Sequence, residues 1–451
     1  MHETSTLAAF TGKLDFADIP APSIAMAKTV LLDGIACLLA GSRSPLGRGA
    51  AHAMGQLGGT AQATIMTSGL RTTARDAAFA NAMALYSVGL NDIHKPSGSH
   101  PGGCIIPVVL ALGEWLDVPG RDMLVAMIAG YEINGRIGRA IKSGHRARGF
   151  HPTGTCGTFG AAAAAGRLFG RNQAQMLDIF GIAGSQASGL YEFHHTGSTT
   201  MVYHAGRAAQ NGIEAVLMAD AGVTGPETVL EGRQGFFVAM SEQTDITEIR
   251  TGLGERFMVD ETSLRPHFGC NSTKATSSAL AALFKSGQCR PDEVAGLTIS
   301  LNPVPARDND IPIANSLLAA RLSVQFNAAL VLATGNVLIR DLEQADLTDT
   351  RVTALTDRVT IRSDAGLPRY GCNIVVSLKD GTTRTCSDAG KRGDPDDALS
   401  WTDVVEKFLR MTAGIIGSQA GLRLVDGVAG LEDSSGHRLA AQIRGALVQA
   451  G

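Results

Sequence analysis

The first half of the chain is patterned for helices. Apolar residues, mainly Ala, Leu, Ile, Met and Val, recur at the three- and four-residue spacing of a helix that buries one face. Short segments rich in Gly, Pro, Ser or Asn separate these stretches and act as stop signals. The predicted helices span 22–41, 73–90, 102–116, 120–143, 153–170, 173–190 and 203–221. We see no strand-like alternation before about residue 295, so this part is expected to be all-helical.

The pattern changes in the second half. Strands are predicted at 297–301, 358–362 and 373–378, with a hairpin turn after the last of them. Predicted helices at 263–286 and 314–334 lie among the strands, and a helical pattern returns at 401–412 and continues to the C-terminus. The predicted fold is therefore mainly α with an α+β part.

Both ends of the chain contribute to the larger domain of this fold. We expect a large all-helical domain from residues 1–262 and 398–451, and a smaller inserted α+β lid domain from residues 263–397. The length of 451 residues agrees with two domains, because it exceeds what one ordinary core can serve.

Composition narrows the class of protein. Hydrophobic residues make up 44% and charged residues only 18%, and there are 54 glycines. This balance predicts close-packed helices and a large buried oligomer surface. The net charge of −3 offers no basic field, so neither nucleic acid nor an anionic membrane surface is expected as a partner. Any anion-binding site must therefore be local.

The N-terminus and the cysteines indicate a cytoplasmic protein. The first residues lack a basic region followed by an apolar stretch, so no secretory signal is expected. No run approaches 18 apolar residues without a charge, so no membrane span is expected. The seven cysteines are scattered and form no CxxC pair, which predicts free thiols rather than disulfides, zinc or an iron–sulfur cluster.

The first cluster of candidate chemistry is the loop 91–103. It holds Asp92, His94 and His100, in a chain with only 11 histidines. The His-Pro-Gly-Gly stretch from His100 can open a helix whose free N–H groups face an anion. The alternative is a solvated loop with a capping Asp. A functional role is favoured, more for His100 than for His94.

A second cluster spans 142–160. His151 precedes Pro-Thr at the start of an Ala- and Gly-rich helix, where an imidazole can act as acid or base near neutral pH. Lys142 belongs to a basic stretch that is either a surface feature or one wall of an acid-binding pocket. The glycines at 154, 157 and 160 follow no strand and precede no Gly-Lys-Ser/Thr, so they predict tight helix packing rather than a nucleotide loop.

Two further polar loops lead into helices. In the segment 194–212, His204 and Arg207 lie one turn apart and share a face, but no carboxylate stands at the spacing of a metal site. In the segment 264–274, Arg265 can bind a carboxylate in bidentate fashion. Cys270 is expected to pack rather than to act as a nucleophile.

These segments combine into one pattern that covers nearly the whole chain. It comprises the early Leu-Leu-Asp-Gly-Ile-Ala helix, His100-Pro101, Gly149-Phe150-His151-Pro152-Thr153, His204-Ala205-Gly206-Arg207-Ala208-Ala209, Thr224-Gly225-Pro226 with Leu230-Glu231-Gly232, and Arg265-Pro266 with Cys270. The pattern resembles the MmgE/PrpD family, which includes 2-methylcitrate dehydratase, cis-aconitate decarboxylase and iminodisuccinate epimerase. The resemblance implies a helical domain with a small α/β lid, a homodimer, and cofactor-independent chemistry on small polycarboxylates.

The chain departs from the family pattern at several positions. Tyr203 lies in a stretch where the family usually carries a lysine, and Arg265 stands where it usually has a second one. Phe326, next to Gln325, lies where the decarboxylases have a tyrosine. Fewer ammonium groups, together with the added Tyr203 and His267, favour a substrate less anionic than a tricarboxylate.

The chemistry implied by the resemblance is proton abstraction next to a carboxylate, with positive charge or N–H donors near the enolate-like intermediate. His100 and His151 are expected to do the acid–base work, and Asp92 to orient a histidine or act as a base. Tyr203 would donate a hydrogen bond or a proton. The residues expected to bind the substrate are Arg265, His267, Lys142, His94, His204, Arg207 and Gln325.

The expected function is that of a lyase, such as a dehydratase, or an isomerase acting on a small di- or tricarboxylate. An epimerase of an imino- or amino-dicarboxylate and a decarboxylase are alternatives, because these reactions differ only in what leaves and where the proton returns. A further alternative is a catalytically altered homologue that binds a metabolite. No cofactor and no metal are expected.

Overall fold

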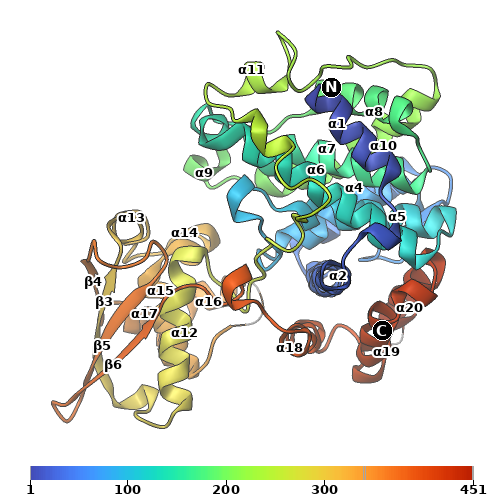
Figure 1. The fold of residues 1–451 in the computed structure, drawn as a ribbon. Helices are drawn as coiled ribbons and strands as arrows, with labels where there is room; N and C mark the ends of the chain where they lie inside the picture. Colours follow the sequence, from blue (N-terminus) through green and yellow to red (C-terminus); the bar gives the residue numbers. More distant parts are fainter. Residues whose placement is uncertain (1, 339, 341, 449–451) are drawn as a thin grey trace. The chain divides into compact units, whose positions relative to one another are not determined.

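The computed structural model describes residues 2–338, 340 and 342–448. The chain divides into two compact units, Met1–Leu264 with Ser400–Gly451, and Arg265–Leu399. The first unit is helical, and the second combines helices with a four-stranded sheet (Figure 1). The fold is therefore mainly α with an α+β part, which confirms the predicted fold class.

The first unit is built from helices of very different length. Its α-helices are α1 (Glu3–Lys13), α2 (Ala21–Gly41), α3 (Pro45–Leu57), α4 (Ala74–Ser87), α5 (Pro101–Leu116), α6 (Gly120–Ala147), α7 (Pro152–Leu168), α8 (Gln173–Gln186), α9 (Phe193–Thr196), α10 (Thr200–Asp220), α11 (Phe236–Met240), α18 (Trp401–Thr412), α19 (Ser418–Ala429) and α20 (Gly436–Val448). Its 3₁₀ turns are η1 (Phe16–Asp18), η2 (Lys95–Ser97), η3 (Ile246–Ile249) and η6 (Leu431–Asp433).

The first unit also contains two short strands, β1 (Ala63–Thr64) and β2 (Arg71–Thr72), which pair antiparallel. The prediction that no strand occurs before about residue 295 was therefore wrong. Each strand has only two residues, which is too short for a period of two to show in the sequence.

Helix α7 forms the centre of the first unit. Every residue from Pro152 to Leu168 is buried except Arg167, because α5, α6, α8 and α10 pack around it. Small residues allow this approach: a Cβ on Gly160 would lie 2.8 Å from the carbonyl oxygen of Gly130 in α6, and one on Gly157 would lie 2.7 Å from Cys104 Sγ in α5. The glycines spaced by three thus serve helix packing, as predicted.

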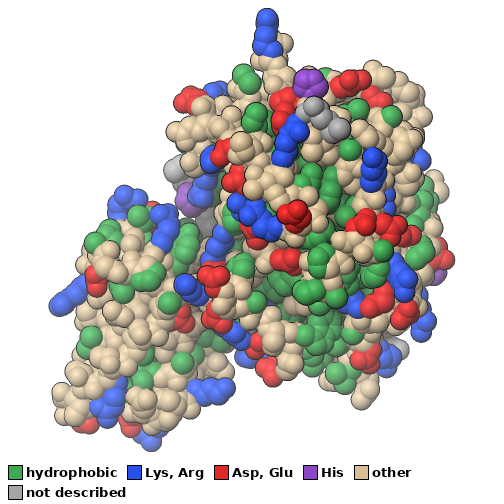
Figure 2. Space-filling view, in the orientation of Figure 1, with side chains coloured by type: hydrophobic (Ala, Val, Ile, Leu, Met, Phe, Trp, Pro, Cys, Tyr) green, Lys and Arg blue, Asp and Glu red, His purple; other side chains and the backbone are tan. Residues whose placement is uncertain are grey.

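The C-terminal helices pack against the N-terminal part of the chain in the first unit. Helix α18 packs against α2, and α20 packs against α5 (Figure 1). Among the described helices, α2 is the one long and apolar enough to cross a membrane by length and composition, and 72% of its apolar window is buried within the protein. Such burial is typical of a core helix. The face drawn in Figure 2 mixes acidic and basic side chains without a large patch of one sign.

The second unit combines short helices with one sheet. Its elements are α12 (Asn271–Lys285), η4 (Pro291–Glu293), β3 (Val294–Leu301), α13 (Pro303–Asp308), α14 (Leu317–Leu322), α15 (Val324–Thr334), α16 (Gln344–Thr348), α17 (Thr350–Thr356), β4 (Val359–Ser363), β5 (Cys372–Leu378), β6 (Thr383–Asp388) and η5 (Pro395–Asp397). The strand order is β4-β3-β5-β6. The β3–β4 pair is parallel, and the β3–β5 and β5–β6 pairs are antiparallel.

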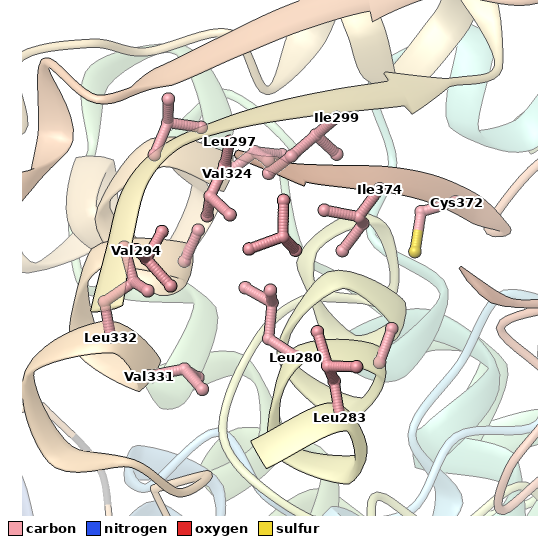
Figure 3. Close-up of a cluster of buried hydrophobic side chains, with 14 of the residues drawn as sticks. Leu280, Leu283, Val294, Leu297, Ile299, Val324, Val331, Leu332, Cys372 and Ile374 are labelled. Carbon is pink, nitrogen blue, oxygen red and sulfur yellow. The ribbon is translucent and has the colours of Figure 1, made fainter. Parts of the chain in front are cut away.

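One face of this sheet carries the core of the second unit. Alternate residues of β5 are buried, in keeping with the side-chain period of a strand. Figure 3 shows Ile299 and Ile374 from the sheet facing Leu280 and Leu283 from α12, with Val331 from α15 beside them. The apolar stripes of the two helices thus cover a single face of the sheet.

Two predicted helices of this unit have different limits in the structure. The helix predicted at 263–286 begins only at Asn271, because the residues before it, including Pro266 and the positive-φ Gly269, form an irregular loop. The helix predicted at 314–334 is broken at Ser323, whose extended backbone ends α14 and whose hydroxyl caps α15.

Candidate active site

Two of the predicted site histidines stand at helix starts. His100 immediately precedes α5 and His151 immediately precedes α7, and each is followed by proline at the first helical position. Proline is favoured there because it has no N–H to leave unpaired. Neither imidazole caps its own helix, so both rings are available for other contacts.

The carboxylate of Asp92 binds the N-terminal end of α5. Its Oδ2 accepts hydrogen bonds from Gly102 N at 3.0 Å and from Tyr131 Oη at 2.9 Å. A Cβ on Gly102 would lie 2.5 Å from Asp92 Oδ1, so the glycine is needed for this approach. The helix N-terminus predicted to face an external anion therefore already binds the carboxylate of Asp92.

The burial of Asp92 changes its acidity. Loss of hydration raises the pKa of Asp92 to about 6, against the opposing hydrogen bonds from Gly102 and Tyr131, and the nearby charge of Asp33 raises it further. A carboxyl group with this pKa can hold or release a proton close to neutral pH. Burial and the carboxylates of Asp92 and Asp33 hold the pKa of Tyr131 well above its ordinary value, so the phenol keeps its proton and stays a hydrogen-bond donor.

His100 is oriented by the main chain rather than by a carboxylate. Its Nδ1 lies 2.6 Å from the carbonyl oxygen of Asp92, so Nδ1 carries the proton and Nε2 is the basic nitrogen of the neutral ring. Asp92 thus contacts this histidine through its backbone carbonyl, while its carboxylate binds Gly102 and Tyr131. His100 N donates to Thr153 Oγ1 at 3.1 Å, which ties the start of α5 to that of α7.

His151 forms a pair with His204 from α10. The two Nδ1 atoms are 3.1 Å apart. His151 is only 4% exposed, and the ring of Phe193 packs edge-on against it with centroids 5.0 Å apart. Burial first, and then the neighbouring His204 and His100, hold the pKa of His151 well below its ordinary value. The ring is therefore neutral at pH 7 and able to accept a proton.

Four other residues of the first unit, predicted to act on a substrate, contact protein groups instead. His94 is fully buried, with Nδ1 2.8 Å from Ser97 Oγ and Nε2 3.5 Å from Glu261 Oε2, so it braces its own loop and has no exposed face for a substrate.

The other three residues have protein partners of their own. Lys142 Nζ binds Asp245 Oδ2 at 3.0 Å, and Arg207 donates to Gln210 on the same helix. Tyr203 is 46% exposed and packs edge-on against Phe79.

Three predicted residues belong to the second unit. The nitrogens of His267 lie 2.8 Å from the carbonyl oxygen of Phe268 and 2.7 Å from Ser278 Oγ. Gln325 is 3% exposed, accepts from Ile311 N and donates to Asp310. Both side chains thus have structural partners within their own unit. Arg265 is partly buried at the start of the irregular loop before α12.

Sequence reasoning missed a buried ion pair close to Asp92. Lys407 Nζ on α18 lies 2.6 Å from Asp33 Oδ1 on α2 and donates to the carbonyl oxygen of Leu90 at 2.9 Å. Both charged side chains are almost fully buried. A lone Asp within an apolar helix was the available signal, but its partner is 374 positions away in sequence.

It also missed the contacts of His145, which lies at the end of α6. Its Nε2 lies 2.7 Å from Thr155 Oγ1 on α7, and its Nδ1 lies 3.1 Å from the carbonyl oxygen of Met240. Burial lowers the pKa of His145 to about 4, so this ring is neutral at pH 7. Its neighbour Arg146 lies over the ring of Tyr191, 4.4 Å from the centroid.

Within the described residues, no three His, Cys, Asp or Glu side chains gather closely enough to hold a metal ion. All seven cysteines are free thiols, as predicted. Cys270 is partly buried and accepts a weak contact from Asn309 Nδ2 at 3.8 Å.

Comparison with known proteins defines the class. The MmgE/PrpD N-terminal domain matches residues 5–249, and the MmgE/PrpD C-terminal domain matches residues 269–433. These matches take in most of both units, so the chain belongs to the MmgE/PrpD family.

Individual relatives share a quarter to a third of their residues with this chain. The cis-aconitate decarboxylase-like protein oryM of Aspergillus oryzae is 29% identical, over 96% of this chain and 95% of its own length. The cis-aconitate decarboxylase of Homo sapiens is 27% identical, over 79% of this chain and 76% of its own. That of Aspergillus terreus is 31% identical over 52% of this chain and 49% of its own.

Proposed function

We propose that this protein is a lyase that abstracts or delivers a proton next to a carboxylate of a small di- or tricarboxylic acid. Its family membership and the decarboxylases among its relatives support an enzyme of the lyase type in general. The observation that carries the proposal is the meeting of Asp92, His100 and the His151–His204 pair at the linked starts of α5 and α7.

The proposed roles follow from protonation state. His151 is the first proton acceptor, because it is neutral at pH 7 and its Nε2 makes no hydrogen bond within the described part of the chain. His100 presents a basic Nε2 from a separate loop and serves as the second acid–base group. Asp92 holds the start of α5, and its titration near pH 6 sets the local charge.

The geometry also supports a second outcome, which is epimerisation or isomerisation. Such a reaction needs two acid–base groups that reach one carbon from different sides, and His100 and His151 come from different loops. Loss of water and inversion both begin when the proton next to the carboxylate is removed and its electron pair stays on the substrate. Decarboxylation instead breaks the bond to the carboxyl group, leaves that electron pair on carbon, and needs a proton delivered there by the same acid–base groups. Among these acids a dicarboxylate is favoured over a tricarboxylate, because the stretch that holds Tyr203 has no lysine where the family usually carries one.

The test is a product assay on a panel of acids. Purified protein is mixed with cis-aconitate, hydroxy-dicarboxylates, hydroxy-tricarboxylates and amino-dicarboxylates, and products are identified by NMR. We expect one acid to be converted, and His151→Ala to abolish the conversion. Inertness towards every acid, with unchanged ligand binding in His151→Ala, would instead mean that the protein is a metabolite-binding homologue.

A further inference from the structure

The contact between His151 and His204 is held by glycines. A Cβ on Gly189, whose φ is +137°, would lie 3.3 Å from His204 Nδ1, and a Cβ on Gly154 would lie 3.2 Å from His204 Cβ. The carbonyl oxygen of Gly189 also accepts the His151 N–H at 2.9 Å. The segment at Gly189 therefore contacts both histidines, and its missing Cβ leaves room for the His204 ring beside His151.

The distance between the two rings restricts their protons. Two Nδ1 atoms 3.1 Å apart are within hydrogen-bond range, and such a bond needs one proton between them. When both rings are neutral, one carries its proton on Nδ1 and the other on Nε2. If His151 holds the shared proton, its Nε2 is a base, and if His204 holds it, His151 Nε2–H is an acid.

Several other groups surround the pair. His100 precedes α5, His145 and Arg146 end α6, and all three act electrostatically on His151. Tyr191 packs against the His151 ring at 5.8 Å between centroids and lies under Arg146. These neighbours are basic or neutral, so a positive charge on His151 alone is disfavoured. A partner ring able to take up part of that charge would lower its cost.

We propose that His204 is the proton partner of His151, a positioning residue that selects the nitrogen of His151 facing the substrate and shares the proton that His151 takes up. This inference rests on the proposed function for its kinetic consequence, but the shared proton belongs to the resting protein. His204 was predicted from the sequence to bind substrate. Its contact with His151 Nδ1 supports the role of proton partner instead.

The proton balance of this step is simple. His151 Nε2 takes a proton from the substrate carbon, and the electron pair of the C–H bond stays on the substrate as an enolate-like anion. The Nδ1 proton of His151 then stays in place or moves to His204 Nδ1, so that one positive charge is spread over two rings. The reverse transfer makes His151 Nε2–H the donor that returns a proton to carbon.

The shared proton in the substrate-free protein is tested by NMR of protein labelled with nitrogen-15 in its histidines. We expect His151 and His204 to show complementary neutral tautomers, one protonated at Nδ1 and the other at Nε2, and His204→Asn to leave His151 protonated at Nδ1. His52→Asn, an exposed position on α3, is the control and should leave both signals in place. Two Nε2-protonated rings with no coupling between them would overturn the proposal.

Kinetics test the consequence for catalysis. The Oδ1 of Asn can replace the acceptor at Nδ1, whereas Leu cannot, so His204→Asn should stay within about tenfold of the wild-type kcat and His204→Leu should lose about 10- to 100-fold. The pH–rate profile of His204→Leu should also shift, which loss of packing alone would not cause. Equal loss in both variants with an unchanged profile would contradict the role. If no acid is converted at all, the proposed function fails, and the NMR result still decides the proton sharing.

Discussion

Asp92 combines two properties that oppose each other. Its carboxylate satisfies the start of α5 and accepts from Tyr131, yet burial raises its pKa to about 6. In the unfolded chain the same group ionises at an ordinary, lower pH. The folded protein therefore binds the extra proton more tightly, and stability that is fully present at low pH is lost as the pH rises towards 6.

The raised pKa of Asp92 predicts that Asp92→Asn stabilises the folded protein at neutral pH. The amide Oδ1 can accept both hydrogen bonds without carrying a charge, so the variant should be more stable than wild type by up to about 3 kcal/mol at pH 7. The difference should shrink as the pH falls from 6 to 4. Urea unfolding across this range measures it. Asp380→Asn is the control, because exposed Asp380 has a lowered pKa and the substitution should give no gain. A gain that is independent of pH would contradict the burial argument.

His151→Ala should separate function from stability. His151 is the proposed proton acceptor, so turnover should fall by about 10²–10⁴-fold while thermal stability changes far less. His94→Ala offers the contrast, because this buried ring braces a loop and lies outside the proposed proton path. It should lower the melting temperature clearly. An equal loss of turnover and stability in His151→Ala would mean that His151 is a structural residue.

The sequence allowed single candidate residues to be predicted, but not which of them contact each other. His100 and His151 could be found because a His-Pro step at a helix start is a local signal. The pairing of His151 with His204 could not, because it depends on how α7 packs against α10 and on the missing Cβ of Gly189. His94 looked equivalent to His100 in the sequence, and only burial distinguishes them.

At the scale of elements, the glycines of α7 decide whether its neighbours can approach. Gly157→Ala would bring a Cβ within 2.7 Å of Cys104 Sγ, in a helix start where every side chain is buried. We expect a loss of about 1–3 kcal/mol. Gly49→Ala in α3 is the matched control, because its Cβ would meet nothing within 4 Å. It should stabilise the protein by about 0.5–1 kcal/mol. Chemical denaturation compares the two, and a stable Gly157→Ala would refute the packing argument.

Elements with a strong local pattern were predicted well. The helix predicted at 401–412 has those limits in α18, where apolar residues recur at helical spacing and Ser400 caps the start. Three of the four strands of the second unit, β3, β4 and β5, were predicted within three residues of their ends. The fourth strand, β6, was not predicted, although a hairpin turn was expected before it. The short α13, α16 and α17 were not predicted, since five to seven residues carry too little periodicity.

At the scale of the whole molecule, we propose that the protein is a homodimer. The chain is poor in charge, and several large apolar side chains of the first unit are exposed, among them Leu190 at 64% and Val238 at 60%. Covering such side chains favours association. Sedimentation equilibrium at micromolar concentration should give twice the mass of one chain. A single-chain mass across that range would rule out a stable dimer.

The proposed reaction begins with the abstraction of a proton next to a carboxylate. The most direct test is proton NMR of candidate di- and tricarboxylic acids incubated with the enzyme in heavy water. We predict that at least one acid loses its α-proton signal to deuterium with wild type and keeps it with His151→Ala. Exchange without net reaction would indicate an epimerase. If every acid keeps its α-proton, or if His151→Ala exchanges it at the wild-type rate, then proton abstraction by His151 is not the reaction of this protein.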